Sequence, residues 1–377
     1  MKEFDIPIER KETILALGPE SAGNFCIYEN GKVYYEKDLG DLIEENNFEN
    51  YKKVLLDFLD KNNLKPDIIC TDLHPEYKTT ILGQELAERF NAKPEKVQHH
   101  VAHIYSVLFD QTIRASIPQP IPQKFIGIAC DGTGYGVDDK IWGGEILKLE
   151  IRNWKLEIDR VGHLENQLLC GGDLAIKQPA RMLLSILLGI KQPKEVWSIF
   201  SAFYSEQEFN TLVKMHEQKF NSLETSSTGR ILDAASFLLG FCSNERKYKH
   251  EPVDLLERNS TEAFDLQPRC DKQDEQDKCD KYILNTSYLF EWLLDNLDKD
   301  KGRLAATVQR YIMDGLIQIA KSVDPNLPIY FGGGMANNKI MSQIAKENGI
   351  IMSDNIERGD YGMSLGQLMY YLRSDKL

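Results

Sequence analysis

The sequence has no pair of cysteines spaced C-x-x-C, although it contains seven cysteines in 377 residues. Zinc fingers are built on such pairs, and a disulfide framework needs an even number of cysteines, so neither scaffold is expected. Cys26, Cys70 and Cys130 lie in apolar runs, and we expect all three to be buried. The sequence therefore predicts a fold held together by an ordinary hydrophobic core.

Long apolar runs and an excess of positive charge are also missing. The longest apolar stretches, such as residues 183–190, are too short to cross a bilayer whose hydrocarbon core is about 30 Å thick. Residues 1–12 lack the apolar centre of a secretory signal, so we expect a cytoplasmic protein without a membrane partner. The formal net charge of −13 would repel a phosphate backbone, which argues against a nucleic-acid partner.

The chain length predicts two lobes, because single domains usually run to about 100–200 residues. The first part of the chain alternates strands and helices, which is typical of an α/β lobe. Strands are expected at 13–18 and 24–36, with Asn30 and Gly31 forming a hairpin turn within the second range. The expected elements that follow are a helix, a strand and two helices, over 48–64, 67–73, 79–90 and 99–110.

A proline-bearing stretch at 116–123 interrupts this pattern, because proline continues neither a helix nor a central strand. We place the lobe boundary there, with the first lobe at 1–120 and the second at 121–377. The second lobe opens like the first, with an apolar strand that ends in a glycine turn at 124–136 and another strand at 140–151. This recurrence resembles the duplicated layout of actin-like proteins.

The remainder of the second lobe is expected to carry a helical insertion over about 174–320, with an exposed loop at 265–281. A short strand at 328–338 then runs into three glycines, and a helix at 362–374 closes the chain. We expect that helix to pack back on the first lobe. The fold class is therefore α/β, a two-lobed actin-like ATPase fold of the ASKHA type.

Three of the seven histidines crowd into residues 99–103. His99 and His103 are four residues apart in a segment of helical pattern, so their imidazoles lie on one face and can share a cation. Two imidazoles with carboxylates and open coordination positions are typical of Fe²⁺ or Zn²⁺. The candidate carboxylates are Asp131 and Asp360, each beside a glycine at the end of a strand or turn. Two ordinary surface histidines are the alternative interpretation.

Three glycine-bearing turns offer backbone N–H groups that no side chain obstructs, a geometry that cradles phosphate oxygens. The first lies at 131–136 and adds the hydroxyls of Thr133 and Tyr135, and the others lie at 171–173 and 332–337. A glycine-rich hairpin is the alternative interpretation of the first turn. Three such turns exceed what hairpins alone require, so we expect a site for a phosphate or a nucleotide.

Eight short motifs, taken together and in this order, resemble the HypF carbamoyltransferase family over about residues 13–370. They are TDLHPEY (71–77), VQHHVAH (97–103), DGTGYG (131–136), WGGE (142–145), CGGDLAIKQPARM (170–182), SSTGRILDA (226–234), GGGMANN (332–338) and GDYGMSLGQ (359–367). The resemblance implies a TsaD-like fold, shared with tRNA threonylcarbamoyl transferases and with the O-carbamoyltransferases of antibiotic pathways.

The resemblance also implies a metal site beside a nucleotide site. The implied metal ligands are His99, His103, Asp131 and Asp360. The catalytic residues expected are His99, His103, Asp131 and Thr133. The cofactor-binding residues expected are Gly132, Thr133, Gly134, Tyr135, Gly171, Gly172, Asp173, Arg181, Gly332, Gly333 and Asn337. The expected cofactors are Fe²⁺ or Zn²⁺ and ATP or carbamoyl-adenylate, with Mg²⁺ as a further candidate.

In the HypF family a carbamoyl group, delivered as carbamoyl-adenylate, is transferred to the C-terminal cysteine of HypE during maturation of NiFe hydrogenase. The resemblance implies the same transfer here, to a HypE-like acceptor protein. A cation can polarise the carbonyl while N–H donors stabilise charge on its oxygen, so no nucleophile from the chain is needed. The alternatives are a tRNA threonylcarbamoyl transferase, a small-molecule O-carbamoyltransferase and a non-catalytic scaffold of a maturation complex.

The chain departs from the family pattern in three places. It resembles only the last module of a longer HypF, so we expect a separate YrdC-like protein to supply the carbamoyl-adenylate. Residues 18–25 lack the lysine-asparagine-threonine run of the family. Residues 248–257 differ from its tyrosine-glutamate-glycine pattern, and Glu251 is expected as the substrate contact there. These changes predict altered phosphate contacts from the first lobe and an altered choice of acceptor.

Overall fold

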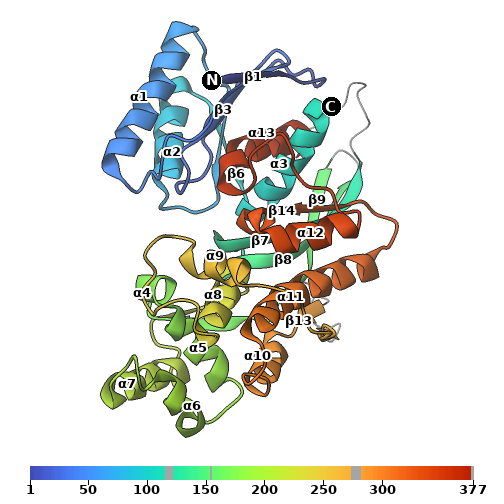
Figure 1. The fold of residues 1–377 in the computed structure, drawn as a ribbon. Coiled ribbons are helices and arrows are strands. Elements are labelled where there is room, and N and C mark those ends of the chain that lie inside the picture. The colour runs from blue at the N-terminus through green and yellow to red at the C-terminus, as the bar shows by residue number, and fades with distance from the viewer. Residues whose placement is uncertain (115–121, 153–154, 273–281, 375–377) are drawn as a thin grey trace.

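The structure, a computed structural model, describes residues 1–114, 122–152, 155–272 and 282–374. Two β-sheets with helices packed against them form an α/β fold, in agreement with the predicted fold class (Figure 1). The lobe boundary predicted at 116–123 lies largely outside the described residues. Within the described helices, none has both the length and the apolar character needed to cross a lipid bilayer.

The first sheet has the strand order β1-β4-β3-β2-β5-β6. β2, β3 and β4 form an antiparallel meander, and β5 and β6 join it in parallel. Asn30 and Gly31 both have positive φ, 48° and 84°, as a two-residue hairpin turn requires, which confirms the predicted turn. The strands are β1 Lys2–Asp5, β2 Ile14–Ala16, β3 Phe25–Glu29, β4 Lys32–Glu36, β5 Ile68–Asp72 and β6 Lys93–Val97.

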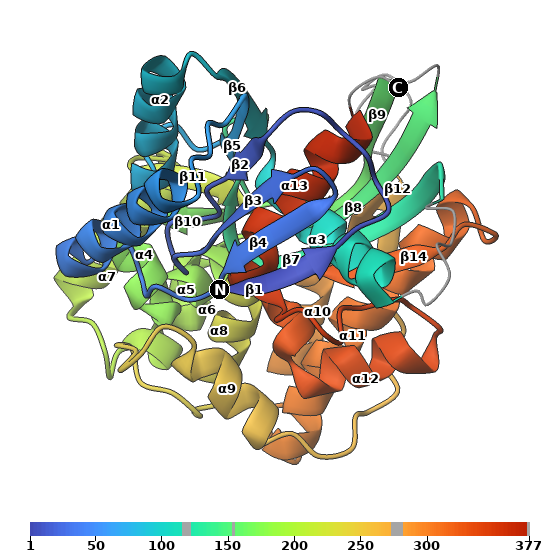
Figure 2. The ribbon, with the colours of Figure 1, turned by 90° about the horizontal axis from the view of Figure 1, so that it is seen from above.

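Each face of the first sheet is covered by a different pair of helices. Leu15 and Leu17 point to the face covered by α1 (Glu45–Lys61) and α2 (Lys78–Phe90). Ile14 and Ala16 point to the other face, because side chains alternate along a strand. That face is covered by α3 (His99–Arg114) and α13 (Met363–Ser374), which pack on each other, and Figure 2 shows α13 beneath β3 and β4.

The second sheet has the order β10-β11-β8-β9-β13-β12, with β7 beside β8 and β14 beside β7. β7 is antiparallel to β8 and parallel to β14. The hydrophobic cluster around α3 includes Phe125 and Leu147 of this sheet, so α3 lies between the two sheets. The strands are β7 Lys124–Tyr135, β8 Ile141–Arg152, β9 Lys155–Leu164, β10 Gln167–Cys170, β11 Ser222–Thr225, β12 Cys270–Lys272, β13 Tyr282–Leu284 and β14 Ile329–Gly332.

The glycine turn predicted at the end of β7 is wrong, because residues 131–135 continue the strand. The register against β8 shifts between Cys130 and Gly134, so the glycines lie at a β-bulge. The hairpin turn comes later, where the N–H of Gly136 donates to the carbonyl of Lys140 at 2.9 Å. Pairing with β8, which no local pattern reveals, outweighs the turn preference of the glycines. A bulge of this kind redirects the side chains around it, including Asp131.

The run over about 174–320 is mostly helical, as predicted, but β11, β12 and β13 interrupt it and join the second sheet. Of the loop predicted at 265–281, residues 265–269 are irregular, residues 270–272 form β12, and residues 273–281 lie outside the described residues. The helices from α4 on are α4 Asp173–Lys177, α5 Pro179–Leu188, α6 Pro193–Phe200, α7 Glu206–Glu217, α8 Thr228–Leu238, α9 Glu251–Arg258, α10 Thr286–Leu294, α11 Lys301–Val323 and α12 Lys339–Glu347, with the short 3₁₀ helices η1 Gly334–Asn337 and η2 Gly359–Gly362.

Candidate active site

The candidate site is built around the first turn of α3, between the two lobes. This turn carries His99, His100 and His103, and all three side chains are buried. β7 lies directly against it, since a Cβ added to Gly134 would be 2.4 Å from the imidazole of His100. A glycine is therefore required at residue 134 for the strand that carries Asp131 to reach the histidines.

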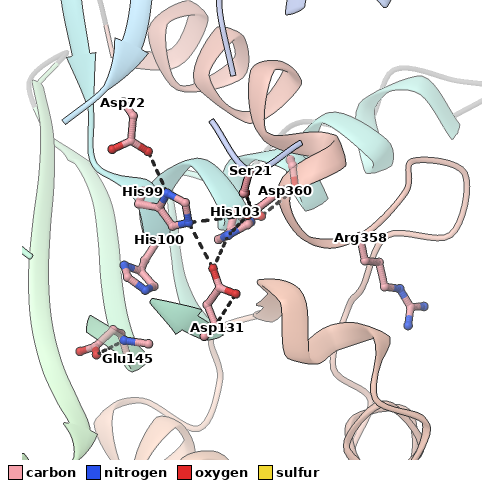
Figure 3. A network of polar contacts seen from close by, with 12 residues as sticks. Ser21, Asp72, His99, His100, His103, Asp131, Glu145, Arg358 and Asp360 are labelled. Atoms are coloured by element: carbon pink, nitrogen blue, oxygen red, sulfur yellow. Dashed lines mark hydrogen bonds and ion pairs between the residues drawn. The ribbon is translucent and has the colours of Figure 1, made fainter. Parts of the chain in front are cut away.

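The four predicted metal ligands, His99, His103, Asp131 and Asp360, converge (Figure 3). Nε2 of His99 and Nε2 of His103 each lie 3.1 Å from Oδ2 of Asp131. They lie 3.7 and 3.5 Å from Oδ1 of Asp360. A tetrahedral ion with bonds of about 2.0–2.2 Å separates its ligands by about 3.3–3.6 Å. These separations lie close to that range, and the candidate ligand atoms all lie within 4.8 Å of one another, so the four side chains can reach one ion.

Asp72 fixes the orientation of His99, since its Oδ2 lies 2.8 Å from Nδ1 of the imidazole. With the proton on Nδ1, the lone pair of a neutral imidazole is on Nε2 and faces Asp131. Two lone pairs face each other stably only with a proton or a metal cation between them. Burial would lower the pKa of His99, but Asp72 and the hydrogen bonds to Asp131 and Asp72 raise it well above its usual value. The His99 site therefore attracts positive charge.

The two carboxylates of the cluster are also suited to a cation. Burial would raise the pKa of Asp131, but hydrogen bonds with His103 and His99 hold it well below its usual value. Oδ1 of Asp360 is buried and accepts no hydrogen bond in the described part of the chain. Such an unsatisfied buried group costs about 1–3 kcal/mol, more when it is charged, and a bound cation would offset this cost. The donor set therefore fits one divalent cation.

The first lobe contacts the cluster through the loop after β2, for which only altered phosphate contacts were predicted. The hydroxyl of Ser21 donates to Oδ2 of Asp360, and Nδ2 of Asn24 donates to the carbonyl of Asp360 at 2.9 Å. Ser21 and Asp72 were both missed. Both residues lie at or after the carboxyl ends of strands, Ser21 after β2 and Asp72 at the end of β5. Polar side chains at such strand ends meet at one edge of the sheet, and this position could have identified them as site residues.

A cavity of about 340 Å³ adjoins the cluster and is lined by residues of both lobes. Its lining includes His99, Asp131 and Asp360. Of the residues predicted to hold a nucleotide, Gly132, Thr133 and Asn337 line this cavity. The metal candidates and part of the predicted nucleotide site therefore share one cavity.

Other predicted nucleotide residues do not line this cavity. Gly171, Gly172 and Asp173 are absent from its lining, and Arg181 lines a second, small pocket with Cys170. The guanidinium of Arg181 donates to the side chain of Gln178 at 2.7 Å. The turn before α4 therefore does not reach the cavity, although glycines at residues 171 and 172 suggested a phosphate loop.

Gly332 and Gly333 allow close packing beneath the cavity rather than lining it. A Cβ at Gly332 would lie 2.7 Å from the carbonyl oxygen of His103, and one at Gly333 would lie 2.2 Å from that of Cys130. Gly134 and Tyr135 are also absent from the lining, and the hydroxyl of Tyr135 donates to Asp139 at 3.2 Å.

Glu251, the expected substrate contact, is buried and does not line the cavity. Its carboxylate accepts the backbone N–H of Lys247 at 2.5 Å. Lys249 and His250, which come just before it, line the cavity instead. The segment that departs from the family pattern therefore contributes Lys249 and His250 to the cavity wall.

A buried cluster of two arginines and one aspartate forms another part of the cavity wall. Nη2 of Arg230 and Nη2 of Arg246 lie 2.9 and 3.0 Å from Oδ2 of Asp233. Burial raises the pKa of Asp233, even though both arginines oppose this. The two guanidiniums carry two positive charges, and Asp233 carries at most one negative charge. This part of the wall is therefore positive, which suits an anionic ligand. No role was predicted for these residues from the sequence.

Glu145 on β8 supports the strand that carries Asp131. It is fully buried and accepts hydrogen bonds from Nε of Arg160 at 2.6 Å and from the hydroxyl of Ser226 at 2.5 Å. Burial would raise the pKa of Glu145, but Arg160 and nearby histidines lower it to about 2. Ser227 follows Ser226 in the chain, and its hydroxyl donates to the backbone carbonyl of Gly132. The network therefore fixes the backbone beside Asp131.

Comparisons with known proteins find similar sequences and similar structures. Residues 127–367 match the family profile described as "Carbamoyltransferase, Kae1-like Domain, second subdomain", and residues 9–110 match "HypF Kae1-like domain". The probable carbamoyltransferase HypF of Methanocaldococcus jannaschii is 36% identical over 97% of this chain and 47% of its own length. A carbamoyltransferase HypF homolog of Cupriavidus necator is 33% identical over 60% of this chain and 55% of its own length.

Two solved structures share the fold over nearly the whole chain. The crystal structure of T. kodakarensis HypF aligns with a TM-score of 0.83 and 27% identity, covering 98% of this chain and 48% of that one. A full-length HypF in a phosphate- and nucleotide-bound form aligns with a TM-score of 0.83 and 24% identity, covering 98% of this chain and 47% of that one. The chain thus spans about half the length of the first relatives it matches.

Proposed function

Because this chain belongs to the HypF carbamoyltransferase family, we propose that it transfers a carbamoyl group from carbamoyl-adenylate to a thiol of an acceptor protein. The observation that carries the proposal is the convergence of His99, His103, Asp131 and Asp360 at a cavity of about 340 Å³. The proposed acceptor is the C-terminal cysteine of a HypE-like protein. A separate YrdC-like protein is the proposed source of the adenylate.

The adenylate is proposed to bind in this cavity. Thr133 and Asn337 offer polar side chains there, and Arg230 and Arg246 offer positive charge for the phosphate. A full-length HypF with the same fold has been described in a phosphate- and nucleotide-bound form, and this supports the proposal that a nucleotide binds here. ATP, accompanied by Mg²⁺, is a second candidate occupant of the same cavity.

A metal ion is proposed for the cluster, held by His99, His103, Asp131 and Asp360. When bound, Fe²⁺ or Zn²⁺ would supply Lewis acidity to the carbonyl or neutralise phosphate charge. Asp72 keeps His99 in the tautomer whose Nε2 lone pair is available to bind the metal ion. Thr133, on the same cavity wall, offers a hydroxyl that can stabilise the charge that develops on the carbonyl oxygen.

The proposal is tested by incubating the metal-reconstituted protein with labelled carbamoyl-adenylate and a peptide ending in cysteine. The wild type is expected to form the S-carbamoyl peptide and AMP. Thr133→Ala is expected to slow transfer about ten- to a thousandfold, through loss of one donor. Thr211→Ala, on the exposed side of α7, is the matched control and is expected to leave the rate unchanged.

Other outcomes would point to other functions. Modification of tRNA with no carbamoylation of any thiol would favour a threonylcarbamoyl transferase, and carbamoylation of small hydroxyl compounds would favour an O-carbamoyltransferase. Binding of adenylate without turnover in the metal-loaded protein would favour a scaffold. Each of these results would contradict transfer to a thiol.

A further inference from the structure

His250 is a histidine of this cavity that the metal cluster does not use. It directly precedes α9 and lines the same cavity as Asp131 and Asp360. The residue is exposed at the rim, and its imidazole has no hydrogen bond or ion pair within the described ranges. It therefore presents a free imidazole to whatever enters the cavity from solvent.

The backbone around His250 is held in place by buried charges. Nη1 of Arg246 donates to the carbonyl of Lys249 at 2.7 Å, while its other terminal nitrogen lies 3.0 Å from Asp233. On the other side of His250, the N–H of Asp254 donates to the carbonyl of His250 at 3.0 Å. Because the segment is fixed on both sides, the backbone that carries the imidazole is in place at the cavity before any ligand binds.

The transfer needs a group that accepts a proton, because a thiol must lose its proton as it attacks a carbonyl carbon. Within the described lining, the carboxylates of Asp131 and Asp360 face the cluster histidines, and that of Asp233 pairs with two arginines. Glu257 accepts the N–H of Lys339 at 2.9 Å. These carboxylates already have partners.

The remaining polar groups of the lining are less suited to the task. Burial raises the pKa of both Tyr77 and Tyr361, so their hydroxyls keep their protons at neutral pH. Asp254 carries a carboxylate, which is ordinarily a much weaker base than imidazole. No cysteine lines the cavity in the part of the chain that the structure describes. By elimination, His250 is the side chain of this wall best suited to accept a proton.

Partial burial keeps the imidazole of His250 neutral at physiological pH. The imidazole is shielded from water on its cavity side, and this partial burial and the neighbouring Lys249 lower its pKa, while Asp254 on α9, Asp131 on β7 and Asp360 on η2 oppose this. Asp233 on α8 also faces it. The net shift of the pKa is downward from 6.5, so the imidazole carries a lone pair at pH 7.

We propose that His250 is the general base that takes the proton of the acceptor thiol, an inference that rests on the proposed carbamoyl transfer. The thiol sulfur forms a bond to the carbamoyl carbon as its proton moves to an imidazole nitrogen. The bond from that carbon to the phosphate oxygen breaks, and AMP leaves with the electron pair. The imidazolium then releases its proton to solvent, and no oxidant or reductant is required.

The test compares the metal-reconstituted wild type with His250→Gln on two peptide acceptors. One acceptor carries an ordinary cysteine thiol, with a pKa near 8.5, and the other carries a thiol acidic enough to be ionised at pH 7. His250→Gln is expected to slow transfer to the ordinary thiol about 10²- to 10⁴-fold. With the acidic thiol the variant is expected to match the wild type, because no proton remains to be removed.

His216→Gln on α7 is the matched control, because His216 is also partly buried with a lowered pKa but lines only the second pocket. An equal loss with both acceptors would show that residue 250 merely shapes the cavity, and no loss with either would also overturn the inference. In both cases the proposed transfer would stand. Absence of transfer by the wild type would instead overturn the proposed function and, with it, the role of His250.

Discussion

Oδ2 of Asp72 lies 2.8 Å from Nδ1 of His99, and only 1% and 3% of the two side chains are exposed. Asp72 is the last residue of β5, and His99 is the first residue of α3. β5 pairs in parallel with β6, which places Asp72 beside Val97, two residues before the histidine. The register of the first sheet thereby sets the direction in which Nε2 of His99 points.

Replacement of Asp72 by asparagine should weaken metal binding. The amide keeps an acceptor for Nδ1 but removes the negative charge that fixes and polarises the imidazole. Loss of such a partner typically lowers metal affinity about 10- to 100-fold. Chelator competition with Zn²⁺ measures this, and Asp60→Asn, at the exposed end of α1, is the control. Equal affinities of Asp72→Asn and the wild type would refute the orienting role.

Arg246→Gln should weaken binding of the adenylate. The arginine contributes to the excess positive charge of the wall around Asp233, and a hydrogen bond to a charged group contributes about 1.5–3 kcal/mol. We expect the Kd for AMP, measured by calorimetry, to rise by about tenfold or more. Arg258→Gln on the exposed side of α9 should leave the Kd unchanged. An unchanged Kd for Arg246→Gln would place the phosphate elsewhere.

Glu145→Gln should destabilise the protein in a pH-dependent way. The folded pKa of Glu145 is about 2, below its ordinary value of 4.5, so its contribution is present above pH 4.5 and is lost as the pH falls towards 2. The shift corresponds to about 3 kcal/mol at pH 7. Urea denaturation at pH 7 and at pH 3 measures the difference in unfolding free energy between variant and wild type. A difference that does not shrink at pH 3 would contradict this account.

Gly366→Ala should destabilise the packing of α13 on α3, although alanine normally favours a helix. A Cβ at residue 366 would lie 1.9 Å from the carbonyl oxygen of Ala102, so the two helices would have to move apart. Such overpacking costs about 1–3 kcal/mol. Gln343→Ala, on the exposed face of α12, should change the unfolding free energy by less than about 0.5 kcal/mol. Equal stabilities of the two variants would contradict the close approach.

Local sequence patterns were sufficient for much of the fold. The hairpin turn at Asn30 and Gly31 and the helical face shared by His99 and His103 each depend on residues close together in the chain. The burial of Cys26, Cys70 and Cys130 followed from the apolar runs around them and is confirmed.

The features that the sequence did not reveal depend on contacts between distant residues. β7 continues through its glycines because β8 pairs with it, which overrides the local preference for a turn. Asp233 lies within α8, whereas Arg246, with which it pairs, follows the end of that helix. No periodic sequence pattern indicates this pairing. Arg181 does not line the cavity, because its guanidinium donates to Gln178 and its side chain lines the second pocket with Cys170.

The central claim is that His99, His103, Asp131 and Asp360 hold one metal ion at the cavity where carbamoyl transfer is proposed. Anomalous diffraction at the metal absorption edge, from crystals of zinc- or iron-reconstituted protein, tests this directly. The account predicts one peak, about 2.0–2.2 Å from Nε2 of both histidines and from both carboxylates. A fully reconstituted crystal with no peak there, or with its peak bound by other side chains, would contradict it.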